Sequence, residues 1–104
     1  MTAMNVVHMR VKPGKEKDFL ALHQEMDAAS MAGGRNFWII KTGERSYCVV
    51  GEWDGTDVLA GSRPAMIAQL DRLRPLLEDL GGGRGETEPY SGEVVFHTRL
   101  NQRS

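Results

Sequence analysis

The chain has 104 residues, of which 13 are basic and 14 acidic, so its net charge is -1. This length suits one domain. We expect the domain to cover 1–104, with its core at about 5–98 and a frayed tail at 99–104. The charges are mixed along the chain and no apolar run is long enough to span a bilayer, so neither nucleic-acid binding nor a membrane location is expected. Because the single cysteine, Cys48, excludes an intrachain disulfide, we expect a cytoplasmic protein.

A first strand is predicted at 5–11 and is closed by Lys12-Pro13-Gly14, because proline breaks a strand ladder and glycine lets the chain turn. A helix is predicted next at 15–31, with acidic residues in its first turn and a glycine pair after its end. Alternation gives the strand two faces, one with Val7, Met9 and Val11 and the other with Val6, His8 and Arg10. The apolar stripe of the helix consists of Phe19, Leu22, Met26 and Ala29, with His23 alongside.

The stretch 35–53 predicts a β-hairpin in which two apolar runs, 37–40 and 47–50, flank the polar turn 41–46. We expect Gly43 to supply the positive φ of the hairpin turn. A strand with one wet face alternates apolar and polar residues, whereas both of these runs are apolar on each face. Both faces of the sheet must therefore be covered.

After a short helical turn through Leu59, Ser62 is the expected N-cap of a second long helix, with Pro64 in its first turn. Pro75 predicts a kink near Arg74, followed by a short helical continuation over 75–80. The glycine-rich joint 81–85 and residues 86–92 then lead into a last strand at 93–99. The apolar stripe of the second helix is Met66, Leu70, Leu73, Leu77 and Leu80, and the apolar residues of the last strand are Val94, Val95 and Phe96.

This order, β-α-β-β-α-β, predicts an α+β, ferredoxin-like domain, in which two helices cover one face of a four-stranded antiparallel sheet. The other face is left bare. With half of each apolar run on it, a bare face would exceed the apolar patch that a soluble monomer exposes. We therefore expect a homodimer in which two subunits press their sheets together.

Three features resemble the antibiotic biosynthesis monooxygenase family of small dimeric α/β-barrel proteins, and the resemblance covers the chain from Asn5 to Thr98. They are the order of the elements, the strand closed by Lys12-Pro13-Gly14, and Gly51-Glu52-Trp53-Asp54, where a strand-ending tryptophan leads into the second helix. The resemblance implies a homodimer with a pocket in each subunit between sheet and helices. Some members oxygenate aromatic polyketides or quinols without metal or flavin, so no cofactor and no metal site are expected.

Other members of that family degrade haem with a first-strand asparagine, a tryptophan and a helical histidine. Aligning the turn at Gly14 puts that asparagine position on Val7, and Asn5 lies two residues away from it. No histidine lies between His23 and His97, so the second helix offers no haem ligand. The sequence therefore argues against haem degradation.

Three residues on different strands are the catalytic candidates: His8, Glu52 and His97. If the first strand is central, flanked by the third and fourth, His8 could approach the other two and form an acid/base relay or a metal site. The alternative is a set of polar groups satisfied across the dimer interface. The substrate-binding candidates are Trp53, Arg10, Tyr47 and Arg63, with core packing as the alternative for Trp53 and a solvated helix start as the alternative for Arg63.

Two functions remain open at this point. The first is a cofactor-independent monooxygenase, or a related oxidative enzyme, in which His8 or His97 takes a phenolic proton from a small quinol-like or anthrone-like aromatic that then reacts with oxygen. The second is a non-catalytic homodimeric module that binds a small apolar metabolite or serves interaction alone. The apolar helix-facing side of the first strand favours this second function.

Overall fold

The central strand of the sheet is β1 (Ala3–Val11), and the structure, a computed structural model, describes residues 1–25 and 33–100. β1 pairs antiparallel with β3 (Ser46–Trp53), which in turn pairs with β2 (Gly34–Gly43) in the predicted hairpin. On its other side β1 pairs with β5 (Thr87–Glu93) and, at its end, with the short strand β4 (Leu77–Glu78). The order is therefore β2-β3-β1, with β4 and β5 sharing the far edge of β1.

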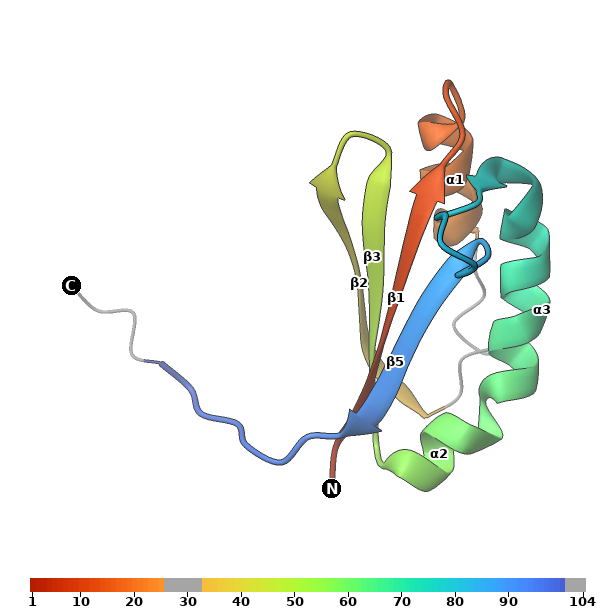
Figure 1. Ribbon diagram of the computed structural model, residues 1–104. Helices are drawn as coiled ribbons and strands as arrows, with labels where there is room; N and C mark the ends of the chain where they lie inside the picture. The colour runs from red at the N-terminus through yellow and green to blue at the C-terminus, as the bar shows by residue number, and fades with distance from the viewer. Residues whose placement is uncertain (26–32, 101–104) are drawn as a thin grey trace.

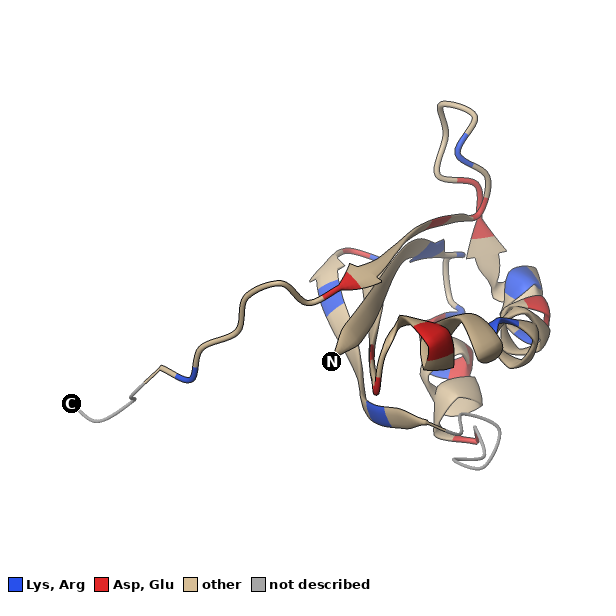
Figure 2. Ribbon diagram, turned by 90° about the horizontal axis from the view of Figure 1, so that it is seen from below, with Lys and Arg blue, Asp and Glu red and all other residues tan. Residues whose placement is uncertain are grey.

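Three helices, α1 (Glu16–Gln24), α2 (Thr56–Gly61) and α3 (Arg63–Leu73), lie on one side of the sheet (Figure 1). Figure 2 shows the same layering from below. This is the predicted α+β, ferredoxin-like arrangement, to which β4 adds a fifth strand. The rest of the predicted first helix lies outside the described residues, with Met26 and Ala29. Within 1–25 and 33–100, no helix combines the length and apolarity that crossing a membrane requires.

The core lies between the sheet and the helices, where the predicted inward face of β1 packs. Met9, Val11 and the α1 residue Phe19 are almost fully buried there. A second cluster at the other end of β1 contains Trp53 and Leu59. The main cluster consists of Met9, Val11, Phe19, Tyr47, Val49, Leu73 and Leu77. The expected stripe of the second helix thus meets the expected face of the first strand.

The turn of the β2–β3 hairpin differs from the prediction, which placed the positive φ at Gly43. Gly43 is still a strand residue and pairs with Ser46, so the turn consists of Glu44 and Arg45 alone. Arg45 takes the positive φ, 58°. Its guanidinium donates to the Val11 carbonyl at 2.9 Å, and its carbonyl accepts from the Val11 amide at 2.7 Å. These contacts with the end of β1 hold a side-chain-bearing residue in a conformation that usually favours glycine.

The predicted helical continuation over 75–80 is wrong, although the helix does end at Arg74. The segment forms a single 3-10 turn, η2 (Arg74–Leu76), and then the strand β4. Pro75 has no amide hydrogen to donate to a carbonyl of the preceding helical turn, and the Leu76 carbonyl accepts from the Lys12 amide at 2.8 Å. Leu77 therefore stays buried, as its place in the stripe predicted, but as a strand residue.

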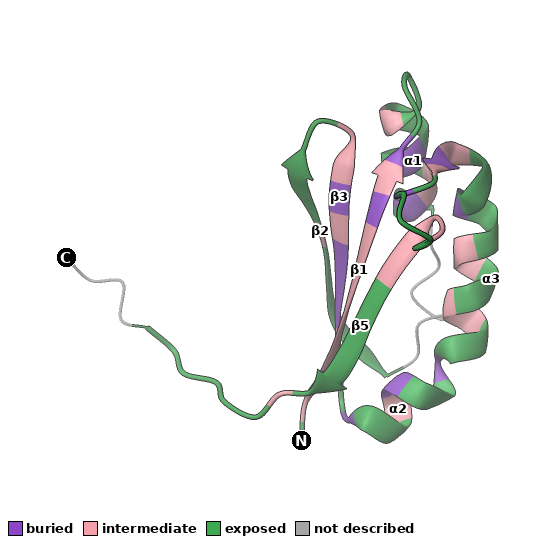
Figure 3. Cartoon of the chain, viewed as in Figure 1, coloured by how far each residue is buried: buried purple, intermediate pink, exposed green. Residues whose placement is uncertain are grey.

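The last strand was predicted at 93–99 and lies instead at Thr87–Glu93. Pro89 falls within it, which the free edge of a sheet tolerates because no neighbouring strand needs its amide hydrogen. The Val94 amide still donates to the Thr2 carbonyl at 2.8 Å, after which the chain leaves the sheet. Figures 1 and 3 show residues 94–100 as an extended, largely exposed segment, so the tail begins at 94 and not at 99.

The sheet face opposite the helices, called the open face below, carries apolar side chains across all the long strands. Direct cross-strand pairing aligns one row of Trp38, Val50, Val6 and Tyr90 and a second row of Ile40, Cys48, His8 and Glu88. Trp38, Ile40 and Tyr90 are 44%, 49% and 65% exposed. Both faces of the hairpin are thus apolar, as predicted, but only one is covered within the chain.

Candidate functional site

A cavity of about 460 Å³ lies between the helix-facing side of the sheet and the helices. This size suits a small organic molecule. All four long strands contribute to its wall, and so do α1, α2 and α3. The wall is mostly apolar, with side chains that include Val7, Met9, Phe37, Val49, Leu59, Met66, Leu70 and Pro89. The polar side chains in it include Asn5, His23, Trp53, Arg63, Gln69, Thr87 and Ser91.

Asn5 and Trp53 form a hydrogen-bonded pair in the cavity wall. The indole Nε1 of Trp53 donates to Oδ1 of Asn5 at 2.7 Å. The amide Nδ2 of Asn5 then points to the Met66 sulfur at 3.9 Å, a weak acceptor. A polar ligand atom that replaced this sulfur would gain a stronger hydrogen bond.

Gly51 leaves the space that this pair occupies. It lies directly opposite Asn5 in the β1–β3 register. A Cβ on Gly51 would lie 2.5 Å from Asn5 Oδ1 and 2.9 Å from Trp53 Nε1, closer than either atom tolerates. Residue 51 must therefore lack a side chain for the pair to form.

His23 contributes an imidazole to the cavity wall, and its ring is held on several sides. Nδ1 lies 2.8 Å from the Phe19 carbonyl, which can only accept, so Nδ1 carries the hydrogen and Nε2 of the neutral ring carries the lone pair. The ring stacks on Phe37 at 6.1 Å and meets the edge of Phe19 at 4.6 Å. Burial lowers the pKa of His23, and the bond to the carbonyl offsets part of this effect. The cavity therefore contains a basic nitrogen in a fixed tautomer.

Two predicted substrate-binding residues, Trp53 and Arg63, line the cavity. Trp53 is 1% exposed and packs with Leu59, so it fills both the wall role and the packing role that the sequence left open. Arg63 is the first residue of α3 and is exposed. It brings a guanidinium to the cavity wall from that helix start.

Tyr47 and Arg10 are not at the cavity. The Tyr47 ring packs in the core against Phe19, and its hydroxyl donates to the Glu16 carboxylate. The same carboxylate pairs with Lys41 at 3.1 Å. The bond from Tyr47, helped by Lys41, lowers the pKa of Glu16, and the bond to Glu16 raises the pKa of Tyr47. Arg10 shares the strand face of His8, away from the helices.

The catalytic candidates His8, Glu52 and His97 do not meet within the subunit. β1 is central, as assumed, but His8 pairs with Cys48, whereas Glu52 pairs with Met4, four residues and about 13 Å away along the strand. His97 lies in the extended tail and is exposed. In the part of the chain that the structure describes, His, Cys, Asp and Glu side chains form no group of three or more able to hold a metal. Their catalytic role stays a prediction.

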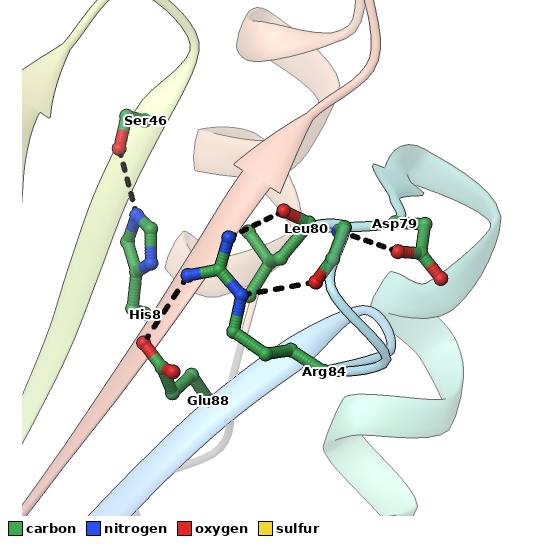
Figure 4. A network of polar contacts seen from close by, with 7 residues as sticks. His8, Ser46, Asp79, Leu80, Arg84 and Glu88 are labelled. Atoms are coloured by element: carbon green, nitrogen blue, oxygen red, sulfur yellow. Dashed lines mark hydrogen bonds and ion pairs between the residues drawn. The ribbon is translucent and has the colours of Figure 1, made fainter.

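His8 and Glu52 each have a local partner on the open face. His8 Nε2 lies 2.9 Å from the Ser46 hydroxyl, beside Glu88, which Arg84 approaches at 3.7 Å (Figure 4). Glu52 accepts from the Asn36 amide at 2.6 Å. Both residues are thus hydrogen-bonded within the chain, and the alternative, in which they are polar groups satisfied across a dimer interface, stays a prediction.

The glycine-rich joint 81–85 lies between β4 and β5. Arg84 folds back over it and donates to the Leu80 carbonyl at 2.6 Å and to the Gly81 carbonyl at 3.0 Å (Figure 4). The Gly81 amide donates to Asp79 at 2.6 Å. The loop is thus closed by its own contacts and opens no helix, so it lacks the geometry of a phosphate site.

Comparison with known proteins shows the same architecture. No family model and no curated protein matches the sequence. Among solved structures, a proposed antibiotic biosynthesis monooxygenase from Chloroflexus aurantiacus J-10-fl superimposes with a TM-score of 0.68 at 18% identity, covering 97% of this chain and 100% of the other. The chain has the fold of the antibiotic biosynthesis monooxygenases. The resemblance expected from the sequence is confirmed at the level of fold.

Two further structures agree. SnoaB, a cofactor-independent oxygenase from Streptomyces nogalater, matches with a TM-score of 0.66 at 15% identity, covering 99% of this chain and 98% of SnoaB. A second proposed antibiotic biosynthesis monooxygenase, from Nitrosomonas europaea, matches with a TM-score of 0.72 at 12% identity over 94% of both chains. At such identities the comparison establishes the monooxygenase-like fold, and the activity has to be argued from the cavity.

The sequence analysis did not assign the two best-placed polar groups, Asn5 and His23. Asn5 has the same strand parity as Val7 and Met9, so alternation alone puts it on the helix-facing side. His23 lies one turn after Phe19, on the buried stripe of α1. The sequence therefore indicates the position of both residues. It does not mark either of them as functional, because neither has a charged neighbour on its own face of the strand or helix.

Proposed function

We propose that this chain is a cofactor-independent monooxygenase, or a related oxidative enzyme, that acts as a homodimer on a small electron-rich aromatic such as a quinol or an anthrone. The observation that carries the proposal is the cavity of about 460 Å³, whose wall combines aromatic and aliphatic side chains with a fixed imidazole and an amide–indole pair. The cofactor-independent oxygenase of the same fold supports the reaction class. The bare apolar open face supports the dimer.

The reaction needs a base, an anion-stabilising group and oxygen. In the proposed mechanism Nε2 of His23 accepts the acidic proton of the substrate, and Nδ2 of Asn5 donates to the resulting oxyanion in place of the Met66 sulfur. The electron-rich anion then reacts with O₂. For an anthrone methylene, one oxygen atom becomes the new carbonyl oxygen, and the other leaves as water with both methylene hydrogens. The substrate supplies the electrons, so the balance needs no external reductant.

The second candidate function is a non-catalytic homodimeric module that binds a small apolar molecule. It is favoured by the polar groups of the cavity, because several are already paired within the subunit. Trp53 donates to Asn5, and the Nδ1 hydrogen of His23 is used by Phe19. A ligand held only by apolar contacts would leave these pairs intact.

Oxygen consumption with a panel of quinols and anthrones tests the proposal. We expect uptake by the wild type, a loss of about 10²–10⁴-fold in His23→Gln, and a rate that falls as the pH drops through the lowered pKa of His23. His8→Ala and His97→Ala test the sequence-based candidates in the same assay and should stay close to wild type. Loss of oxygen uptake in these two variants but not in His23→Gln would assign the chemistry to His8 and His97, outside the cavity. Tight binding of an aromatic compound without any oxygen uptake would support the second candidate function, the non-catalytic binding module.

A further inference from the structure

Arg63 is the charged residue of the cavity wall. The other described residues that line the cavity are apolar or carry neutral polar groups. Arg63 lines it together with three apolar residues of the same helix, Met66, Leu70 and Leu73. Because these four positions recur at spacings of three, four and three residues, they lie on one face of α3. The first position of the stripe that faces the sheet is thus a guanidinium instead of an apolar side chain.

The charge of Arg63 has no ion-pair partner in the part of the chain that the structure describes. Two other arginines near the end of α3 are paired, Arg72 with Glu25 at 3.7 Å and Arg74 with Glu86 at 3.1 Å. The first turn of α3 contains no acidic residue. A cation at the start of a helix also opposes the helix dipole, so Arg63 does not serve the stability of α3. Its charge is permanent and available to an anion.

Arg63 lies one helical turn before the residue that contacts Asn5. This residue is Met66, whose sulfur lies 3.9 Å from Nδ2 of Asn5. His23 lies farther along the same wall, where it stacks on the first residue of a cross-strand row. From β2 to β5 the row consists of Phe37, Gly51, Asn5 and Ser91. The cavity thus offers an imidazole at the β2 end of the row, an amide on the central strand, and a guanidinium from the helix that contacts this amide.

We infer that the aromatic substrate of the cavity carries a carboxylate, which Arg63 binds while the electron-rich ring lies beside Asn5 and His23. The planar guanidinium presents its N–H donors in the geometry of the two carboxylate oxygens, so this anion suits it best. The inference rests on the proposed function. It narrows the substrate class from quinols and anthrones in general to those that bear an acid group.

The same charge determines which way round the substrate enters the cavity. Elsewhere along the described wall, a carboxylate would lose its hydration against apolar side chains and meet no opposite charge. At Arg63, which is exposed, it keeps contact with water and gains a charge-assisted hydrogen bond. The acid group therefore holds one end of the molecule at the start of α3 and leaves the ring to the base and the amide. Arg63 is thus a specificity-determining residue rather than a catalytic one.

Binding of two unreactive probes tests the inference. They are anthraquinone-2-carboxylate and its neutral carboxamide, each titrated near neutral pH and followed by tryptophan fluorescence. We expect the wild type to bind the carboxylate about 10–100 times more tightly than the carboxamide, the range for a hydrogen bond to a charged group. Because Arg63 is exposed, added salt should weaken this preference.

Variants of α3 assign the preference to one residue. Arg63→Gln should lose the preference and bind the carboxamide as the wild type does, whereas Arg63→Lys should keep part of it. Arg72→Gln is the matched control, because it removes the same charge from the same helix at a position outside the described cavity wall. This control should keep the full preference for the carboxylate.

Equal affinity of the wild type for both probes would overturn the inference, and so would a preference that survives in Arg63→Gln. The inference also fails if neither probe binds. In each of these cases, oxygen uptake with neutral quinols and anthrones decides the proposed function separately. The expected preference without any oxygen uptake would keep the inference and favour the binding module over the oxygenase.

Discussion

Gly51 determines the shape of the cavity wall because it has no Cβ. The pair formed by Asn5 and Trp53 occupies the space that a side chain at this position would need. Both the packing of the second core cluster and the polar lining of the cavity therefore depend on one glycine. A glycine in a strand usually weakens it, so its presence here marks a close approach of other groups.

Gly51→Ala should separate Asn5 from Trp53 and reduce stability by about 1–3 kcal/mol, because the new methyl overlaps both polar atoms. The same change should weaken binding of any aromatic that uses the Asn5 amide. Urea unfolding measures the first effect, and a titration followed by tryptophan fluorescence measures the second. Gly61→Ala is the control, since a Cβ there meets nothing within 4 Å, and it should leave stability within about 1 kcal/mol of wild type. Equal stability of the two variants would contradict the close approach.

At the residue scale the sequence predicted on which face of the sheet each side chain lies. It did not predict which face carries the polar groups of the cavity. Trp53 and Arg63 were assigned to ligand binding and do line the cavity. The catalytic candidates were sought among the charged and basic residues of the strands, and His8 and Glu52 lie on the open face. The cavity instead holds an amide and a buried imidazole, because an apolar cavity can keep only polar groups whose bonds are met locally.

At the scale of elements, Arg45 links four strands through one turn. It makes the turn between β2 and β3, bonds with Val11 of β1, and forms an ion pair with Glu78 of β4 at 2.6 Å. The contacts compensate for its positive φ, which costs a side-chain-bearing residue about 1–2 kcal/mol. The turn is thus stabilised by tertiary contacts rather than by its own residue preference.

Arg45→Ala and Arg45→Gly separate these two contributions. Both lose the guanidinium contacts, but glycine also relieves the backbone strain, so Arg45→Gly should be more stable than Arg45→Ala by about 1 kcal/mol. Urea unfolding of both proteins gives the difference. Glu78→Gln keeps the turn and removes only the charge, so it should lie between wild type and Arg45→Ala. An alanine variant as stable as the glycine variant would show that the turn carries no strain.

The elements missed by the sequence analysis share a cause. Residues 94–96 have the strongest strand pattern near the C-terminus, yet the strand is at Thr87–Glu93, which contains a proline and a glycine. The apolar pattern of a segment indicates how much free energy it gains when it is buried, but it does not indicate which element buries it. Likewise, the strand β4 forms after Pro75 because the end of β1 lies beside it, which no local rule contains.

At the scale of the whole molecule, the order of elements and the apolar hairpin sufficed to predict the ferredoxin-like arrangement. The sheet with helices on one side follows from the periodicities of its segments. The same argument predicted that the second face needs cover. The single chain leaves this face exposed, with Trp38 at 44% and Ile40 at 49%.

Trp38→Asp and Ile40→Asp should therefore shift the chain toward monomers without unfolding it, because each puts a charge at the centre of the proposed interface. Light scattering coupled to gel filtration at micromolar concentration should show the mass of one subunit. Leu20→Asp is the matched control: this α1 residue is 38% exposed on the helix side, and its variant should keep the wild-type mass. If all three variants elute alike, the open face is not the contact surface.

Cys48 lies in the second row of the open face and is the only cysteine in the sequence. In the homodimer proposed above, its sulfhydryl would be enclosed between the two chains, and it would be accessible in the monomer. An alkylating reagent would then modify this one atom at a speed governed by how often the pair separates. The rate of Cys48 alkylation would therefore report on the proposed association, and diluting the sample should make the reaction faster.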